Sequence, residues 1–156
     1  KMAALAIFIT DVHAIGPQQA QGLLLTTAFY WDRSPESRAW SKRFFDKHGA
    51  MPTMSQAGVY SAVMHYLKAV EALKSDADGA AVVAKMKEMP TDDKLFGKGE
   101  VRADGRKIHP MYLFEVKKPA ESKDPAADLY KIVSTIPGGN LFTPADKSGC
   151  QSLVTN

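Results

Sequence analysis

The sequence LAIFIT at positions 5–10, followed by DVHAIG at positions 11–16, decides the expected fold. A short apolar run that contains β-branched and aromatic residues predicts a buried strand. A second apolar run, LLLTTA at positions 23–28, follows a segment that Pro17 opens and Gly22 ends, which predicts a short helix between two strands. A strand, a helix and a strand in this order favour an α/β fold, in which helices cover a parallel sheet.

Three longer helices are expected in the middle of the chain. Ser34 is a cap residue before Pro35, and Gly49 ends that helix. Residues 55–73 form the longest periodic segment, and residues 80–89 form a third helix that Pro90 ends. The spacing of apolar residues predicts which faces are buried. These are Trp40 and Phe44 in the first helix, and Val59, Val63, Tyr66, Leu67 and Val70, widened by Tyr60 and Met64, in the second.

The last third of the chain has the pattern of strands. Asp104-Gly105 is a strong hairpin signal between 100–103 and 106–117, although Pro110 requires an edge position or a bulge in the second arm. A final strand is expected at 129–136. The adjacent acids Asp92 and Asp93 follow Pro90, and we interpret them as a solvated loop.

Composition narrows the class of protein. The chain has 156 residues, 45% hydrophobic and 24% charged, which fits one globular domain or a piece of a larger protein. The net charge of +3 is spread along the chain without a basic stripe, so we expect no nucleic-acid partner. The longest apolar run, Met2–Ile9, is far shorter than the roughly 20 residues of a membrane helix, so we expect no membrane insertion. Cys150 is the only cysteine, and it is either a lone buried thiol or one whose partner lies on chain not shown.

Common catalytic and cofactor motifs are absent. The sequence contains no phosphate-binding loop, dinucleotide-binding turn, zinc-protease motif or nucleophile elbow. The histidines lie on different expected elements and form no metal pair. We therefore expect no cofactor and no metal. An acid–base set of Asp11, His13 and Ser55 is the enzyme alternative, and we disfavour it.

Two places carry candidate ligand-binding residues. Asp11 and His13 follow the first expected strand, and ligands of open α/β sheets bind beyond such strand ends. The spacing leaves open that Asp11 only caps a turn and that His13 is merely half exposed. Tyr30 lies in an aromatic run after the second strand, where it either stacks on a ligand or packs in the core. Tyr60 has the same two interpretations, and the helix start at Ser55 offers N–H groups to a carboxylate.

Several segments in order resemble a known family. They are DVHAIG at 11–16, AQGL at 20–23, FYWD at 29–32, MSQAGVYSA at 54–62, HYLKA at 65–69, RADGR at 102–106 and YLFEVK at 112–117. Together they resemble the C-terminal part of periplasmic solute-binding proteins of ABC transporters, of the branched-chain amino acid type. Within that family the chain looks closest to members from soil and photosynthetic bacteria that take up aromatic acids.

The resemblance implies part of a type I periplasmic-binding-protein fold, with two lobes, parallel sheets flanked by helices, and crossovers at a hinge. It assigns residues 1–32 to the second lobe, 33–107 to a helical segment of the first lobe, and 108–156 to the second lobe and the C-terminal tail. It also implies that Cys150 matches a near-terminal cysteine of the family. Asp11, His13 and Tyr30 would then approach the ligand from one side, and Met54, Ser55 and Tyr60 from the other.

The resemblance implies a function without catalysis. The protein would trap an amino acid or an aromatic carboxylate in the periplasm and deliver it to an ABC permease, and the full-length protein would carry a signal peptide. The alternative is a ligand-sensing domain of a receptor or regulator with the same fold. Because apolar faces such as Ala3–Ile9 would lack partners, we expect self-association as a dimer and weak ligand binding by this segment alone.

Overall fold

The computed structural model describes residues 2–147 and 149, and these residues form two compact units. The first unit comprises the described residues up to Ala57 together with Met111–Ile136. The second comprises Gly58–Pro110 and the described residues from Pro137 onward. The chain therefore passes between the units at three places. Which unit corresponds to which expected lobe stays a prediction.

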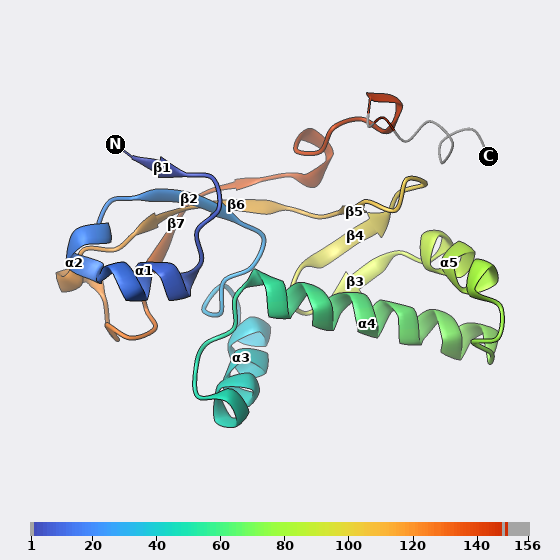
Figure 1. Ribbon diagram of the computed structural model, residues 1–156, viewed down its shortest axis with the longest axis horizontal. Helices are drawn as coiled ribbons and strands as arrows, with labels where there is room; N and C mark the ends of the chain where they lie inside the picture. Colours follow the sequence, from blue (N-terminus) through green and yellow to red (C-terminus); the bar gives the residue numbers. More distant parts are fainter. Residues whose placement is uncertain (1, 148, 150–156) are drawn as a thin grey trace. The chain divides into compact units, whose positions relative to one another are not determined.

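The first unit is built on a four-stranded sheet of order β1-β2-β6-β7 (Figure 1). Its strands are β1 (Ala3–Ala4), β2 (Leu24–Thr27), β6 (Met111–Val116) and β7 (Tyr130–Ile136). The strands β1 and β2 are parallel, and α1 (Ile9–Ile15) and α2 (Pro17–Ala20) lie between them in sequence, so a strand–helix–strand step is present with a first strand other than the expected one. The pairs β2–β6 and β6–β7 are antiparallel, so the sheet is mixed rather than wholly parallel.

A helix stands where the sequence predicts the end of the first strand. The strand expected at 5–10 is wrong, because β1 covers only Ala3–Ala4 and α1 spans Ile9–Ile15. The carbonyl of Phe8 accepts hydrogen bonds from the N–H groups of Asp11 at 3.0 Å and Val12 at 3.1 Å. These bonds satisfy backbone groups that a strand would pair with a neighbour.

The core of the first unit lies between α1, α2 (Pro17–Ala20) and the sheet. In β6 alternate residues face the core, and Tyr112, Phe114 and Val116 are buried. Fully burying a side chain such as Phe114 contributes about 1.5–3 kcal/mol. The core residues are Ile9, Val12, Ala20, Leu25, Tyr30, Tyr112, Phe114, Val116, Leu129 and Tyr130.

The helix α3 (Pro35–His48) begins and ends where the sequence predicts. The Ser34 hydroxyl accepts a hydrogen bond from the Ser37 N–H, and Gly49 adopts the left-handed conformation with φ of 78°. Ser37 and Ser41 are buried, whereas Trp40 and Phe44 are only half-buried. The Trp40 ring meets the Phe29 ring edge-on, with the ring centres 5.7 Å apart. The predicted buried face of α3 is therefore partly confirmed.

The helix α4 (Met54–Leu73) is confirmed, but its expected buried face is wrong. Val59 is 66% exposed, and Val63, Tyr66 and Leu67 are also exposed. Within the second unit, the buried positions of α4 are instead Ser61, His65 and Ala69, four residues apart. The two polar side chains are satisfied in these positions, since the Ser61 hydroxyl donates to Asp93 Oδ2 at 2.6 Å and His65 Nε2 lies 2.8 Å from the Met86 carbonyl oxygen.

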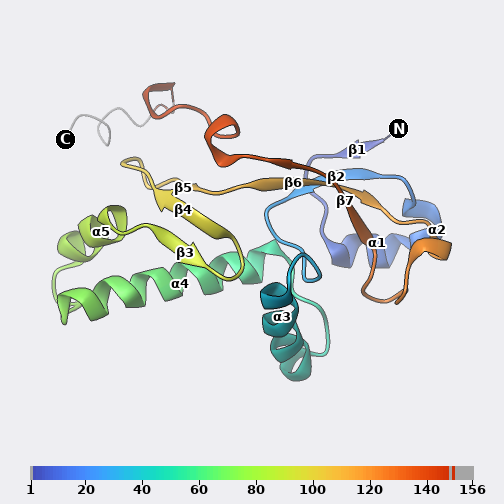
Figure 2. The ribbon, with the colours of Figure 1, turned by 180° about the vertical axis from the view of Figure 1, so that it is seen from behind.

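The second unit places α4 beside a three-stranded antiparallel sheet, as Figures 1 and 2 both show. Its strands are β3 (Thr91–Asp93), β4 (Gly97–Val101) and β5 (Lys107–Ile108). The helix α5 (Gly79–Glu88) precedes them, and the Asp78 carboxylate caps it by accepting hydrogen bonds from the N–H groups of Ala80 and Ala81.

Asp93 lies in β3 and is only partly exposed, so the expectation of a solvated loop is wrong for this residue.

The hairpin at Asp104-Gly105 is confirmed, but its second arm is divided. Gly105 has a φ of 82°, and β4 pairs with β5 through Glu100 with Ile108 and Val101 with Lys107. The expected single arm over 106–117 is wrong, since β5 ends at Ile108 and β6 begins in the other unit at Met111. Pro110 lacks an N–H group for a ladder hydrogen bond, which explains the interruption.

Three short 3-10 helices complete the described structure. They are η1 (Pro119–Glu121), η2 (Gly138–Asn140) and η3 (Ala145–Lys147). Among the described residues, no helix is both long and apolar enough to cross a bilayer. The expectations for Cys150 lie outside the described residues.

Candidate functional site

A small hollow in the first unit lies where α1 and α4 begin and where β2 ends. Its cavity volume is about 10 Å³, which is room for roughly one water molecule. The walls are mostly aromatic and aliphatic. The residues that line it are Ile7, Phe8, Ile9, Thr27, Phe29, Tyr30, Pro52, Thr53, Met54 and Tyr130.

Tyr130 contributes an unsatisfied polar group to these surroundings. Its side chain is 4% exposed, and within the described part of the chain its hydroxyl has no hydrogen-bond partner. Burial, together with the nearby Tyr30 and Asp11 side chains, raises the pKa of Tyr130 well above its ordinary value, so the phenol stays protonated. Leaving such a group unpaired costs about 1–3 kcal/mol.

Tyr30 lines the same hollow, but its hydroxyl, unlike that of Tyr130, is fully hydrogen-bonded. Its hydroxyl donates to the Ala127 carbonyl at 3.1 Å and accepts the N–H groups of Leu129 at 3.1 Å and Tyr130 at 3.3 Å. Burial raises the pKa of Tyr30 well above its ordinary value. The Tyr30 ring therefore forms part of the wall, while its hydroxyl holds the start of β7.

Met54 and Ser55 stand at the start of α4, and only Met54 lines the hollow. The Ser55 side chain is exposed, and its N–H donates to Thr53 Oγ1 at 3.1 Å. The Thr53 N–H donates to Gln56 Oε1 at 2.9 Å. The expectation that the Ser55 N–H is free for a carboxylate is therefore wrong.

Asp11 and His13 lie within α1 rather than at the end of a strand, which corrects their expected setting. The Asp11 carboxylate accepts the Phe8 N–H at 2.7 Å, so Asp11 caps the first turn of α1. Both side chains are exposed. Asp11 is near enough to Tyr130 to raise its pKa, whereas His13 lines no part of the hollow.

Tyr60 belongs to the second unit and is 39% exposed. The structure thus brings Tyr30 and Met54 together at the hollow and places Asp11 close to Tyr130. Sequence reasoning missed Phe8 and Tyr130 as wall residues. No motif marks either residue, because Tyr130 begins an ordinary strand and its unpaired hydroxyl depends on neighbours far away in sequence.

A metal centre has no support in residues 2–147 and 149. No group of three or more His, Cys, Asp or Glu side chains in this part of the chain could hold an ion.

Comparisons with known proteins agree with one another. The family model described as a periplasmic binding protein matches residues 1–124. A periplasmic binding protein from Burkholderia mallei is 51% identical, with a TM-score of 0.88, over 94% of this chain and 38% of its own. A branched chain amino acid ABC transporter periplasmic ligand-binding protein from Burkholderia xenovorans LB400 is 41% identical, with a TM-score of 0.86. The match covers 92% of this chain and 38% of that protein's chain.

A more distant structure shares the fold. It is a solute binding protein of an ABC transporter from Rhodopseudomonas palustris HaA2 in complex with p-hydroxybenzoic acid, 23% identical, with a TM-score of 0.71, over 88% of this chain and 37% of its own. No curated protein matches the sequence.

The matched segment exceeds half of the chain, although the chain spans only 38% of the length of the two Burkholderia structures. The expected type I periplasmic-binding-protein fold is confirmed, and so, at the level of the family, is the expectation of a binding protein rather than an enzyme. The chain belongs to the periplasmic binding protein family.

Proposed function

We propose that this chain forms part of the solute-binding component of an ABC importer, which traps an amino acid or an aromatic carboxylate in the periplasm. Family membership supports a solute-binding role. The unpaired Tyr130 hydroxyl beside the hollow is the observation that carries the proposal, because a ligand oxygen would satisfy it.

The size of the hollow limits what it receives. A volume of about 10 Å³ holds one oxygen atom of a ligand or one bridging water, and not a whole ligand. The carboxylate would therefore reach toward Tyr130, while the body of the ligand lies against Phe8 and Met54. Phe8 supplies an aromatic surface, and Met54 is a flexible apolar side chain that adapts to several shapes.

The other candidate residues take secondary roles in this proposal. Tyr30 positions the start of β7 through its saturated hydroxyl. Asp11 sets the start of α1, and so the position of Phe8. His13, Ser55 and Tyr60 are exposed side chains that the rest of a two-lobed protein would bring to the ligand. The loaded protein would then dock on an ABC permease, with no chemical change in the ligand.

A thermal-shift screen tests the proposal. The protein used should carry this sequence within a chain of the length of its Burkholderia relatives, because a binding cleft between lobes needs both. Amino acids and aromatic acids are the ligands screened, and a binder raises the melting temperature since it binds only the folded form. Tyr130→Phe should weaken the affinity for the best ligand roughly tenfold, the effect of one lost buried hydrogen bond.

Tyr66→Phe is the matched control, because Tyr66 is an exposed tyrosine on α4. It should leave the affinity unchanged. A screen without any stabilising amino acid or aromatic acid would overturn the proposal, as would a Tyr130→Phe protein that binds as tightly as the parent.

A further inference from the structure

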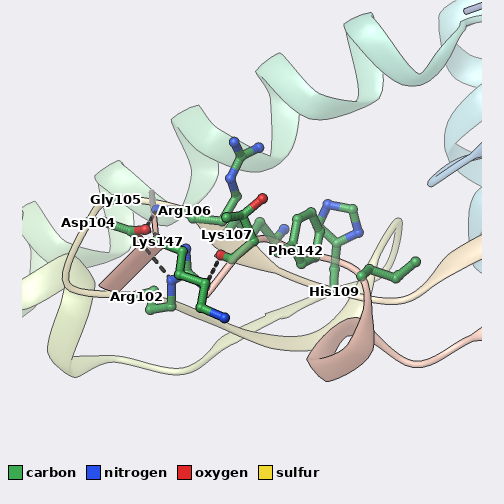
Figure 3. A pocket seen from close by; sticks show the side chains of 10 residues that line it. Arg102, Asp104, Gly105, Arg106, Lys107, His109, Phe142 and Lys147 are labelled. Atoms are coloured by element: carbon green, nitrogen blue, oxygen red, sulfur yellow. Dashed lines mark hydrogen bonds and ion pairs between the residues drawn. The ribbon is translucent and has the colours of Figure 1, made fainter. Parts of the chain in front are cut away.

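A second, larger pocket lies wholly within the second unit. It has a cavity volume of about 790 Å³ and lies between the β4–β5 hairpin and the segment 141–147 (Figure 3). This volume falls in the range of small-molecule sites, roughly 300–1,000 Å³. The candidate ligand residues considered above do not line it.

The lining is strongly cationic. Arg102, Arg106, Lys107 and Lys147 face one acid, Asp104. Two of these cations already have partners. Arg102 Nε donates to Asp104 Oδ1 at 2.9 Å, and Lys107 Nζ donates to Asp93 Oδ2, which lies outside the pocket lining, at 2.7 Å.

Arg106 and Lys147 carry the uncompensated charge. Neither forms an ion pair with any residue that the structure describes. Burial lowers the pKa of His109, which also lines the pocket, below its ordinary value of 6.5, so this ring is neutral at neutral pH. The pocket therefore holds two positive charges that have no ion-pair partner within residues 2–147 and 149.

Contacts among the lining residues position Arg106 and Phe142. The Arg106 guanidinium lies 5.6 Å from the centre of the Phe142 ring, and that ring meets His109 edge-on at 5.4 Å. Arg102 Nη1 donates to the Thr143 carbonyl at 3.0 Å, which ties the hairpin to the segment that carries Phe142. Gly138 holds the same segment close, because a Cβ there would lie 2.7 Å from the His109 carbonyl oxygen.

We propose that this pocket binds a small organic oxyanion with at least two negative charges, such as a di- or tricarboxylate or a phosphate monoester. Arg106 presents planar N–H donors that match a carboxylate or a phosphate, and Lys147 supplies a second point charge. Phe142 provides an apolar wall for the carbon skeleton. A ligand with a single charge would leave one of the two cations unpaired.

Isothermal titration calorimetry of the 156-residue chain with citrate, at fixed ionic strength, tests this site. Saturable one-to-one binding is expected, and the double variant Arg106→Gln/Lys147→Gln should weaken it at least roughly tenfold. The control Lys94→Gln/Lys98→Gln removes the same number of charges from exposed positions of the same unit, outside the pocket, and should leave the affinity unchanged.

The outcomes are distinct from those of the thermal-shift screen, since the two sites share no residue. The pocket is not an oxyanion site if citrate shows no saturable binding up to about 1 mM. The same conclusion follows if the Arg106→Gln/Lys147→Gln protein keeps its affinity, or if the Lys94→Gln/Lys98→Gln control loses as much.

Discussion

Two buried tyrosines of the first unit, Tyr30 and Tyr130, have opposite hydrogen-bonding states. Their rings lie 5.0 Å apart in one aromatic cluster with Phe114. The Tyr30 hydroxyl has three backbone partners, whereas the Tyr130 hydroxyl has none among the residues described. The pair thus separates a tyrosine used for structure from one that is free to bind a ligand.

Tyr30→Phe and Tyr130→Phe should therefore differ in their effect on stability. Tyr30→Phe removes three hydrogen bonds at a buried site, to the Ala127 carbonyl and from the N–H groups of Leu129 and Tyr130, and should lower the free energy of unfolding by about 1–3 kcal/mol. Tyr130→Phe removes an unsatisfied group and should be neutral or slightly stabilising. Urea denaturation of the two variants measures the difference, and equal losses would contradict this account of the two hydroxyls.

The sequence allows only part of this distinction to be predicted. The aromatic run at 29–31 marks Tyr30 as either a ligand or a core residue, and the structure places it in the core. Tyr130 lies in a strand whose apolar pattern predicts burial but not the state of the hydroxyl. The neighbours of Tyr130 include Tyr30, Asp11 and the start of α4, which are remote in sequence.

At the scale of elements, one polar cluster joins α4 to β3 and β5. Lys107 Nζ donates to Ser61 Oγ at 2.6 Å and to Asp93 Oδ2 at 2.7 Å, and the Ser61 hydroxyl donates to Asp93 Oδ2 at 2.6 Å. Lys107 also lies 4.7 Å from the centre of the Phe96 ring. Three elements of the second unit are therefore held by one carboxylate.

This cluster should make stability depend on pH. Partial burial alone would raise the pKa of Asp93, but hydrogen bonds from Lys107, Ser61 and the Phe96 N–H outweigh it and hold the pKa below its ordinary 3.8. A lowered pKa means that the carboxylate stabilises the fold above about pH 3.8 and that this contribution is lost as the pH falls through the folded-state value.

Asp93→Asn removes that dependence and leaves the Lys107 cation without its partner. It should lower the free energy of unfolding at pH 7 by about 1–3 kcal/mol, and less at low pH. Urea denaturation between about pH 2 and pH 7 measures both effects. Asp92→Asn is the control at the exposed neighbouring position and should change little. If both variants show the same pH profile, the cluster does not hold these elements together.

Local signals predicted most elements, and the failures have physical causes. Hydrogen bonds within a few residues fix two of these elements. The helix α3 is set by Ser34 and Gly49 at its ends, and the β4–β5 hairpin by Asp104-Gly105 at its turn. The strand expected at 5–10 fails because an apolar run fits a helix start as well, and the first turn is closed by Asp11 rather than by a Ser or Thr cap. The predicted buried face of α4 is wrong because Ser61 and His65 face inward instead, where they have polar partners far away in sequence.

At the scale of the whole molecule, the exposed apolar residues of α4 are a surface that we expect to drive self-association. Val59, Val63 and Leu67 are each about half or more exposed. At roughly 25 cal/mol per Å² of apolar area, covering such side chains is favourable. The expected dimer stays a prediction.

Val63→Glu should weaken that association, because a carboxylate on the contact surface loses its hydration when a second copy covers it. Val83→Glu is the matched control, since Val83 is 50% exposed on α5 and Val63 is 49% exposed on α4. Light scattering coupled to size exclusion gives the mass of each protein. A monomeric parent chain, or a Val83→Glu protein that dissociates as readily, would remove α4 as the contact surface.

In the function proposed here, the surroundings of Tyr130 receive the oxygen of a carboxylate ligand in a solute-binding protein. A crystal structure of the longer protein with its most stabilising acid tests this most directly. We expect a ligand oxygen within hydrogen-bond distance of the Tyr130 hydroxyl, with the ligand body against Phe8 and Met54. A ligand that is bound without contact to any of these three residues would contradict it.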